Sequence, residues 1–269
     1  MNITAGLEYE ERGDGEVIYL VHAGVHSGWL RPLFRERGLN GFRVIRVVRP
    51  GYGRSEVPAA HLSLADHARA CGRLLRALGV ERAFWVGQSS SCCIGLQMAL
   101  DDPELVAGLV LYEPAKPFGP LREQAASTYL GPGMAAAAHG DIPGAFDIFL
   151  RGVGGDGYRE ALHNAVGAEG VDSAVRESAY FFADEMPALL EWTFGAAEAA
   201  AVTAPTLIAH GAESRPWFHE NAEILAGLLS GAESITLPGA GHLAPQTHPA
   251  EAASVIADFA RSRATIVRS

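Results

Sequence analysis

The sequence contains few cysteines. Three are present among 269 residues, two of them adjacent at Cys92 and Cys93, and no Cys-x-x-Cys spacing occurs. An odd number without paired spacing argues against both a disulfide framework and a zinc site. We therefore expect the cysteines to be buried as small hydrophobic side chains, in a protein of a reducing compartment.

Long apolar runs and an excess of positive charge are also missing. No run is long enough to cross a bilayer, and the N-terminal region carries Glu8, Glu10 and Glu11 where an export signal would be apolar. The net charge of −10 argues against nucleic acid or an anionic membrane surface as a partner. These absences predict a cytoplasmic protein that binds neither nucleic acid nor membrane.

Recognisable metal and phosphate motifs are absent as well. The ten histidines include no His-Glu-x-x-His spacing. No Gly-x-x-x-x-Gly-Lys or Gly-x-Gly-x-x-Gly sequence follows a predicted strand, which disfavours a phosphate-cradling loop. We expect no metal and no cofactor.

What is present is a regular alternation of strand and helix patterns. Of all residues, 48% are hydrophobic and 19% are charged, as in a globular protein with a sizeable core. Strand-like patterns predict strands at residues 3–9, 17–21, 43–48, 84–86, 108–112, 206–210 and 233–237, and the continuous apolar run at 17–21 is of the kind that forms a strand buried on both faces. Helical patterns predict helices at residues 62–78, 91–100, 217–229 and 250–261.

This alternation predicts an α/β fold, in which a mostly parallel sheet carries helices on both faces. Residues 116–202 differ, because they are rich in alanine and glycine, contain short helical pieces and show no strand pattern. We interpret residues 1–115 and 203–269 as the core, and residues 116–202 as a helical cap inserted over the sheet.

A serine in the turn after the central strand has the features of a nucleophile. The strand pattern stops at Gly87 and a helical run begins four residues later, which is the layout of a nucleophile elbow. The strained backbone of such a turn requires small residues two before and two after the nucleophile. Ser89 meets this rule with Gly87 and Ser91. Ser90 would have the bulky Gln88 as a flank, and Ser91 lies too far past the strand, so we predict Ser89.

Candidate partners follow in the order serine, acid, histidine. His242 lies in a glycine-rich loop after the last strand, where its imidazole could take the proton of a serine hydroxyl. The acid that orients this histidine has two candidates, Glu113 after the strand that follows the elbow helix, and Glu213 after the next strand. The commonest acid position, three residues after Gly211, is Ser214, which has no carboxylate. We favour Glu113 on chain position.

An oxyanion hole needs two backbone N–H groups. One is expected from Ser90, the residue after the nucleophile. The other is expected from the loop after the first buried strand, where Gly24 is the first candidate, since glycine allows a close approach, and Val25 is the second. His22 and His210 end buried strands, and we expect both to be structural and satisfied by backbone carbonyl groups.

These motifs together resemble the α/β-hydrolase fold. The matching segments are His-Ala-Gly at 22–24, Arg-Pro-Gly-Tyr-Gly-Arg-Ser at 49–55, the elbow, and Gly-Ala-Gly-His at 239–242. They span nearly the whole chain, and their combination is specific for that fold.

Within that superfamily the chain is most similar to the zearalenone lactone hydrolases. The segments that resemble theirs are Tyr-Glu-Pro at 112–114, Val-Gly-Gly at 153–155, Gly-Ala-Glu-Ser at 211–214 and Gly-His-Leu-Ala-Pro at 241–245. The resemblance implies Glu113 as the acid, and Gly24 and Ser90 as oxyanion donors. It also implies that Phe182 lines the pocket, at a position where the family has tryptophan. Ala23 stands where the family has an acidic residue.

The leading hypothesis is a serine hydrolase that cleaves an ester or lactone of a small apolar substrate, with a zearalenone-type macrolactone as first choice. Ser89 would form an acyl-enzyme without a cofactor. The cap would supply an apolar pocket with Phe181, Phe182, Met186, Trp192 and Phe194, of which Phe182, Met186 and Trp192, with Val25 from the core, are the predicted substrate-binding residues. Two alternatives stay open, a non-hydrolytic protein that binds a small ligand, and an acyl transferase or carbon–carbon hydrolase on the same fold. The sequence also leaves open whether the chain forms a homodimer.

Overall fold

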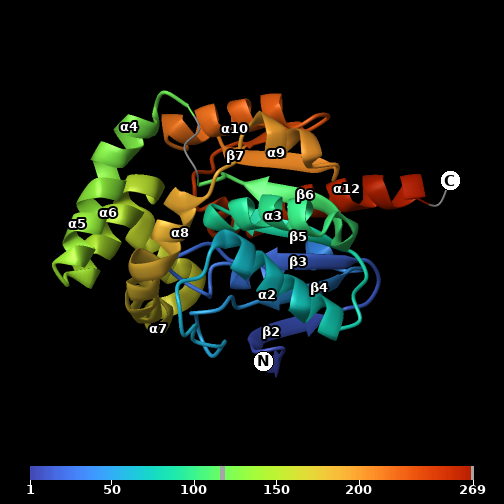
Figure 1. Cartoon of the computed structure of the whole chain (residues 1–269), viewed down its shortest axis with the longest axis horizontal. Helices are drawn as coiled ribbons and strands as arrows, with labels where there is room; N and C mark the ends of the chain where they lie inside the picture. Colours follow the sequence, from blue (N-terminus) through green and yellow to red (C-terminus); the bar gives the residue numbers. More distant parts are fainter. Residues whose placement is uncertain (116–118, 268–269) are drawn as a thin grey trace.

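The computed structural model describes residues 1–115 and 119–267, with side chains as far as residue 263. Its centre is an eight-stranded sheet with the order β1-β2-β4-β3-β5-β6-β7-β8 (Figure 1). The strands are β1 (Asn2–Thr4), β2 (Leu7–Arg12), β3 (Val17–Val21), β4 (Arg43–Val47), β5 (Ala83–Gln88), β6 (Val106–Tyr112), β7 (Thr206–Gly211) and β8 (Glu233–Leu237). β1–β2 and β2–β4 pair antiparallel and the other neighbours pair parallel, so the predicted mostly parallel sheet is confirmed.

The helices lie on both faces of this sheet. They are α1 (Arg31–Phe34), η1 (Arg37–Leu39), α2 (Leu64–Ala77), α3 (Ser90–Asp101), η2 (Pro103–Leu105), α4 (Arg122–Ala125), η3 (Ala126–Leu130), α5 (Gly131–Ala138), α6 (Ile142–Gly154), α7 (Tyr158–Tyr180), η4 (Phe181–Glu185), α8 (Met186–Glu191), α9 (Ala196–Ala201), α10 (Pro216–Leu228), α11 (Ala244–Thr247) and α12 (Pro249–Val267). α2 and α3 pack together in front of the sheet in Figure 1, and α12 lies behind it.

The central strands bring distant parts of the sequence to one edge. All six residues of β5 are buried, which explains its continuous apolar run, since side chains alternate between two covered faces. β5 pairs in parallel with β3 and β6, and β6 pairs with β7, with Gln88 opposite Tyr112 and Tyr112 opposite Ala209. Loops that follow these strands therefore meet at the carboxyl edge of the sheet, where ligands bind in open α/β folds.

The described residues between β6 and β7 form helices and no strand, as predicted. Helices α4 to α8 lie beyond the carboxyl edge of the sheet, at the left of Figure 1. The predicted first residue of the cap, residue 116, lies outside the described residues. The division of the chain into a core and a cap stays a prediction.

Two predicted boundaries were wrong for local reasons. The single strand predicted at residues 3–9 is divided into β1 and β2 by a turn at Ala5 and Gly6, whose φ angles are 50° and 79°. The helix predicted from residue 62 begins at Leu64. Its N-cap is Ser63, whose hydroxyl accepts the Asp66 N–H at 3.2 Å while the Asp66 carboxylate accepts the Ser63 N–H at 2.9 Å.

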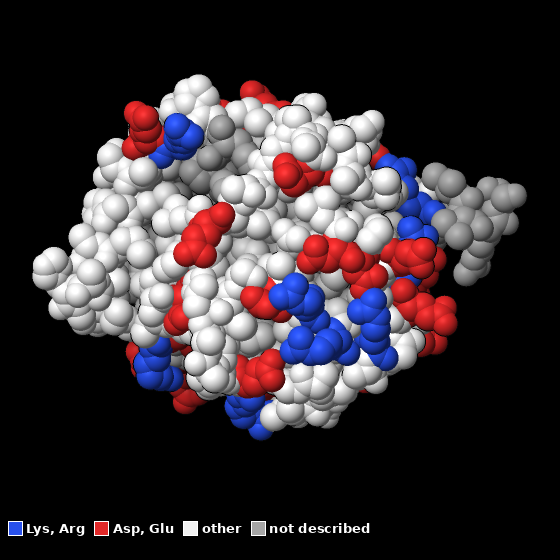
Figure 2. Space-filling model, viewed as in Figure 1, with Lys and Arg blue, Asp and Glu red and all other residues white. Residues whose placement is uncertain are grey.

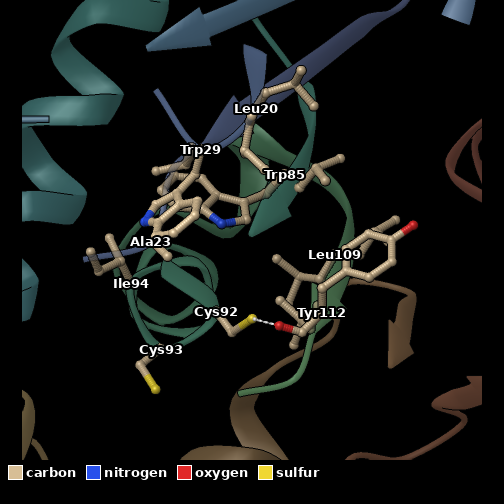
Figure 3. Packing of buried hydrophobic residues seen from close by; sticks show 14 of the residues in the cluster. Leu20, Ala23, Trp29, Trp85, Cys92, Cys93, Ile94, Leu109 and Tyr112 are labelled. Carbon is tan, nitrogen blue, oxygen red and sulfur yellow. Dashed lines mark hydrogen bonds between the residues drawn. The ribbon is translucent and has the colours of Figure 1, made fainter. Parts of the chain in front are cut away.

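The cysteines are buried, as predicted, and all three are unbridged. Figure 3 shows Cys92 and Cys93 pointing in different directions from α3, with the Cys92 thiol 3.4 Å from the carbonyl oxygen of Tyr112. Burial raises the pKa of Cys92 well above 9.0, and raises that of Cys71 to about 11. Both thiols are therefore protonated at neutral pH and act as packing groups.

The face seen in Figure 2 carries a positive patch among scattered acidic groups. The positive patch there lies over α2, where Arg69, Arg73 and Arg76 each form an ion pair with an acidic side chain. The helices at the left of the view expose a largely uncharged surface. Within the described residues, none of the helices combines the length and the apolar character needed to span a membrane.

Candidate active site

Ser89 occupies a strained turn between β5 and α3. Its φ is 54° and its ψ is −120°, and residues other than glycine rarely adopt such a φ. A Cβ at Gly87 would lie 2.7 Å from the carbonyl oxygen of Ser91, so this flank accepts only glycine. Ser91 fits as the other flank because its hydroxyl accepts the Gln88 N–H at 2.8 Å and donates to the Val21 carbonyl at 2.7 Å. The strand, turn and helix of a nucleophile elbow are therefore present.

The imidazole of His242 contacts Glu113 and not Glu213. Nδ1 of His242 lies 2.7 Å from Oε2 of Glu113, and both side chains are buried. Glu213, the other candidate acid, is exposed. Because the carboxylate accepts a hydrogen bond, a neutral His242 carries its proton on Nδ1 and keeps a lone pair on Nε2.

Two donors from the turn after β7 hold the carboxylate of Glu113. Its Oε1 accepts the N–H of Gly211 at 2.7 Å and the hydroxyl proton of Ser214. The φ of Glu113 is 51°, a second strained position beside the sheet edge. Ser214, which the sequence excluded as an acid, therefore holds the carboxylate that comes from the neighbouring strand.

His242 is fixed by its neighbours and faces the elbow. The Phe218 ring stacks on the imidazole, with centroids 4.2 Å apart and planes at 16°. The Gln88 amide donates to the His242 carbonyl at 2.8 Å, and it also bonds the side chain of Gln246 at 3.1 Å. Ser89 and His242 line one small cavity of about 20 Å³. No pattern in the sequence pointed to Phe218 or to the two glutamines.

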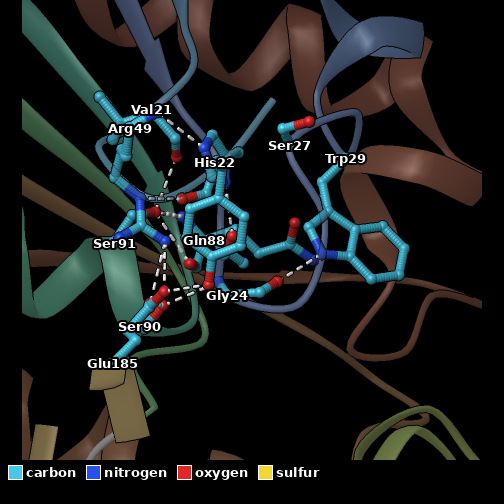
Figure 4. Close-up of polar contacts among 12 residues, drawn as sticks. Val21, His22, Gly24, Ser27, Trp29, Arg49, Gln88, Ser90, Ser91 and Glu185 are labelled. Atoms are coloured by element: carbon cyan, nitrogen blue, oxygen red, sulfur yellow. Dashed lines mark hydrogen bonds and ion pairs between the residues drawn. The ribbon is translucent and has the colours of Figure 1, made fainter. Parts of the chain in front are cut away.

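Gly24 and Ser90 are adjacent, but their contact differs from the one expected. The N–H of Gly24 donates to Oγ of Ser90 at 2.9 Å (Figure 4). The Gly24 carbonyl accepts the Trp29 indole N–H at 2.7 Å and the His26 N–H at 2.9 Å. Val25 follows with a φ of 73° and lines the small cavity. The N–H of Gly24 thus has a partner within the protein, which the sequence did not reveal.

A larger cavity of about 420 Å³ opens at Ser89 and Ser90. Its walls are mainly apolar, and the bulky side chains that line it include Tyr129, Phe149, Phe181, Met186, Leu189 and Phe218. The volume is in the range of pockets that enclose small organic molecules. This cavity is therefore the space at the elbow in which a substrate of that size would fit.

Met186 lines this larger cavity as predicted, but Phe182 and Trp192 line neither cavity at Ser89. Phe182 is buried against Phe181, with ring centroids 5.1 Å apart. Trp192 donates its indole N–H to the Gln97 side chain at 2.8 Å. The prediction that Phe182 and Trp192 line the pocket was wrong, whereas Phe181, which was also predicted, lines both cavities.

A buried carboxylate beside the elbow was missed by the sequence analysis. Glu185, at the end of η4, is fully buried and pairs with Arg49 at 2.9 Å. It also accepts the hydroxyl protons of Ser90, at 2.5 Å, and of Tyr52. The available signal was an acidic residue in the apolar stretch Phe-Phe-Ala-Asp-Glu-Met, a pattern that alone does not distinguish a buried carboxylate from an exposed one.

His22 is structural, as predicted. Its Nδ1 donates to the Ala23 carbonyl at 2.6 Å and its Nε2 accepts the Arg49 N–H at 3.0 Å. Burial, together with the nearby Arg49, lowers the pKa of His22 well below 6.5, so the ring is neutral. His210 differs from expectation, because its Nε2 contacts the Thr236 hydroxyl at 2.9 Å and not a carbonyl. Within the described residues, no three His, Cys, Asp or Glu side chains are grouped as metal ligands would be.

Comparison with known families identifies the fold. A sequence model of the alpha/beta hydrolase fold family matches residues 16–249. The chain belongs to this family. The match includes the elbow, the acid and the histidine described above, and it agrees with the observed sheet and helices.

Individual relatives are similar over shorter segments. The chain is 33% identical over 114 residues to the 2-hydroxy-6-oxo-6-phenylhexa-2,4-dienoate hydrolase of Comamonas testosteroni, a match that covers 40% of each chain. It is 35% identical over 98 residues to a pimeloyl-acyl-carrier-protein methyl ester esterase of Yersinia pseudotuberculosis, which covers 36% of each chain. The chain thus matches about two fifths of the length of these relatives.

A solved structure is similar over almost the full length. The enol-lactonase of Burkholderia xenovorans superposes with a TM-score of 0.74, and the match covers 94% of this chain and 95% of that one. Sequence identity is 20%. At this identity the similarity shows a shared fold.

Proposed function

We propose that this protein is a serine hydrolase that cleaves an ester or lactone bond of a small apolar molecule, with Ser89 as the nucleophile. The observation that carries the proposal is the buried contact of His242 with Glu113, beside a cavity that Ser89 also lines. The strained backbone of Ser89 supports it, because strain of this kind occurs at catalytic elbows. Membership of the alpha/beta hydrolase fold family supports it as well.

In the proposed reaction, Nε2 of His242 takes the hydroxyl proton of Ser89 while Oγ attacks the acyl carbon. The carbonyl electrons move onto oxygen, and the N–H of Ser90 stabilises that negative charge together with the N–H of Gly24, which is then shared between the oxyanion and Oγ of Ser90. The bond to the leaving oxygen then breaks, and His242 returns the proton to it. A water molecule repeats the sequence on the acyl-enzyme, which releases the acid and restores Ser89. Glu113 stabilises the protonated imidazole in both halves.

Ser90 suits the donor role because it is the first residue of α3, and the first N–H groups of a helix have no partner within it. The same helix end favours negative charge through the aligned peptide dipoles. An oxyanion at this place would therefore meet a donor that already points toward it.

The apolar cavity supports the proposed class of substrate. Its volume of about 420 Å³ and its aromatic and aliphatic walls suit a small apolar ester or lactone. A zearalenone-type macrolactone is our leading choice, on the resemblance described above. The names of the methyl ester esterase and of the enol-lactonase refer to the same two kinds of bond. In this proposal the predicted cap, residues 116–202, covers the site.

A second candidate is hydrolysis of a carbon–carbon bond. It is favoured by the similarity to a 2-hydroxy-6-oxo-6-phenylhexa-2,4-dienoate hydrolase. A substrate of that name holds a ketone and no ester, so its hydrolysis must break a carbon–carbon bond. The same serine and histidine could serve either reaction, and the substrate decides between them.

Ser89→Ala tests the proposal. We expect the wild type to hydrolyse a short p-nitrophenyl ester or a macrolactone, and the variant to lose at least about 10³-fold in kcat, because the nucleophile is gone. Fluorophosphonate should label the wild type at Ser89, with mass spectrometry locating the adduct. Undiminished activity of Ser89→Ala would refute the nucleophile. An unlabelled and inactive wild type would favour a ligand-binding protein, and turnover of the oxo-dienoate alone would favour carbon–carbon hydrolysis.

A further inference from the structure

We propose that Glu185 is a positioning residue for this reaction, which fixes the hydroxyl of Ser90 and through it the position of the Gly24 peptide, whose N–H Ser90 Oγ shares with the oxyanion. The inference rests on the proposed function, because it assigns a role within the same site. Two hydrogen bonds in series carry it: Ser90 Oγ to Glu185 Oε1 at 2.5 Å, and Gly24 N–H to Ser90 Oγ at 2.9 Å. Figure 4 shows the three residues side by side.

The direction of this chain of hydrogen bonds is fixed by the charge of Glu185. Burial alone would raise the pKa of Glu185, but Arg49, His67 and the hydroxyl donors outweigh it, and the pKa is lowered below 4.5. An ionised carboxylate only accepts, and a serine hydroxyl has one proton. The proton of Ser90 must therefore point to Glu185, which leaves the lone pairs of Oγ for the N–H of Gly24.

The carboxylate itself is held rigidly. Nη2 of Arg49 lies 2.9 Å from each oxygen of Glu185, and the Tyr52 hydroxyl donates to one of them. The side chains of Glu185 and Arg49 are both fully buried. Nε of Arg49 donates to the His22 carbonyl at 3.0 Å, at the start of the same loop. One ion pair therefore anchors the oxyanion loop at His22 directly and at Gly24 through Ser90.

The loop lies directly against η4 at Gly24. A Cβ added there would lie 2.3 Å from a ring carbon of Phe181 and 3.2 Å from Oε1 of Glu185. Only glycine allows this approach. The same short element thus supplies a wall of the larger cavity, through Phe181, and the group that orders the oxyanion loop, through Glu185.

An ion pair that only stabilised the fold would be buried in the same way. The test must therefore separate an effect on kcat from an effect on stability. Ser90→Ala removes the hydroxyl and keeps both the backbone N–H of residue 90 and the Glu185–Arg49 pair. We expect kcat for an activated ester to fall about 10- to 100-fold with KM within about twofold, because one oxyanion donor loses its position. An unchanged or higher kcat would overturn the proposal, the higher value by showing that the hydroxyl competes with the oxyanion.

Glu185→Gln keeps the shape of the side chain and removes the charge. We expect a similar fall in kcat and a lower Tm, since Arg49 loses its partner. In the double variant Ser90→Ala with Glu185→Gln, the fall in kcat should not exceed that of Glu185→Gln alone, because the carboxylate acts through the hydroxyl. If the two effects multiply, Glu185 does not act through Ser90 and the inference fails.

Glu177→Gln is the matched control. Glu177, on α7, accepts the Ser27 N–H at 2.6 Å and the Ser27 hydroxyl proton at 3.0 Å, so it holds the same loop without touching Ser90. We expect a lower Tm with kcat within about twofold of the wild type. A fall in kcat equal to that of Glu185→Gln would show that general loop rigidity, and not the Ser90 contact, sets the rate.

Failure of this inference is distinguishable from failure of the proposed function. A wild type that hydrolyses the ester and is labelled at Ser89, with Ser90→Ala equally active, overturns the inference alone. A wild type that is neither active nor labelled overturns the proposed function and the inference with it. If Glu185→Gln does not fold, as circular dichroism would show, Ser90→Ala still decides.

Discussion

Glu113 reaches His242 from the end of β6, although the commoner position for such an acid follows β7. The two strands are parallel neighbours, with Tyr112 opposite Ala209, so their ends meet at one point of the sheet edge. A carboxylate from either strand can therefore approach the same imidazole. In this chain the turn after β7 contributes Ser214 instead, whose hydroxyl donates to Glu113.

At the scale of residues, the two candidate acids predict opposite outcomes. Glu113→Gln should lower kcat by about 10³- to 10⁴-fold, because an amide in place of the acid can favour the wrong tautomer of His242 and cannot stabilise its protonated form. Glu213→Gln, at an exposed position, should leave kcat within about twofold. Steady-state kinetics on one activated ester would check both. A large loss in Glu213→Gln with little loss in Glu113→Gln would contradict the assignment.

The sequence could predict Ser89 and Glu113 together because each directly follows a buried strand with a continuous apolar pattern. His242 was predicted from its glycine-rich loop after β8, a strand whose first four residues are exposed. Residues that follow parallel strands lie at the same edge of the sheet, whatever the conformation of the loops between them. The Gly24–Ser90 contact could not be predicted, since it depends on the orientation of a single peptide group. Glu185 could not be predicted either, because its partners come from segments more than 90 positions away.

At the scale of elements, η4 determines which of its side chains contact the cavity and Ser90. It is a π-helical turn, which is wider than an α-helical one. Residues in such a turn do not follow the 3.6-residue period on which sequence patterns depend. Phe181 and Phe182 are both buried aromatic residues, but only Phe181 lines the cavities at Ser89. The sequence predicted both rings for the pocket, and the resemblance singled out Phe182, which lines neither cavity.

Matched leucine substitutions would separate the two phenylalanines. Phe181→Leu should change KM for a bulky apolar ester by at least about threefold, because the ring is part of the cavity wall. Phe182→Leu should leave KM within about twofold and lower Tm, since its ring packs within the helical layer, where a change of shape costs about 1 kcal/mol. Kinetics and thermal unfolding on the same preparations would test this. An effect on KM confined to Phe182→Leu would restore the original prediction.

At the scale of the whole molecule, the apolar patterns of the sequence predicted the fold class, but they did not predict the division into β1 and β2 or the strand order. The apolar runs of β3, β5 and β6 are long because helices cover both faces of these strands, and this made them visible in the sequence. The antiparallel pair β1 and β2 was invisible as a pair, because the turn at Ala5 and Gly6 lies within a continuous strand-like pattern. Strand order depends on pairing between distant segments, which no local pattern records.

The buried histidines make the stability of the whole molecule depend on pH. His67 on α2 is fully buried, and burial, reinforced by Arg49, lowers its pKa from 6.5 to about 4. Burial also lowers the pKa of His22 well below 6.5. Between pH 6.5 and 4 the unfolded chain therefore binds protons that the folded chain does not, and the free energy of unfolding falls as the pH falls.

His67→Leu should flatten this dependence, because it removes one of the groups that take up a proton only on unfolding. With a folded pKa near 4, His67 accounts for about 2 kcal/mol of the stability lost between pH 7 and pH 5. Urea unfolding of wild type and variant at both pH values would measure the difference. His163→Leu, at an exposed position, is the control and should keep the wild-type dependence. An equal loss of stability in wild type and His67→Leu would show that His67 is already protonated in the folded protein at pH 5.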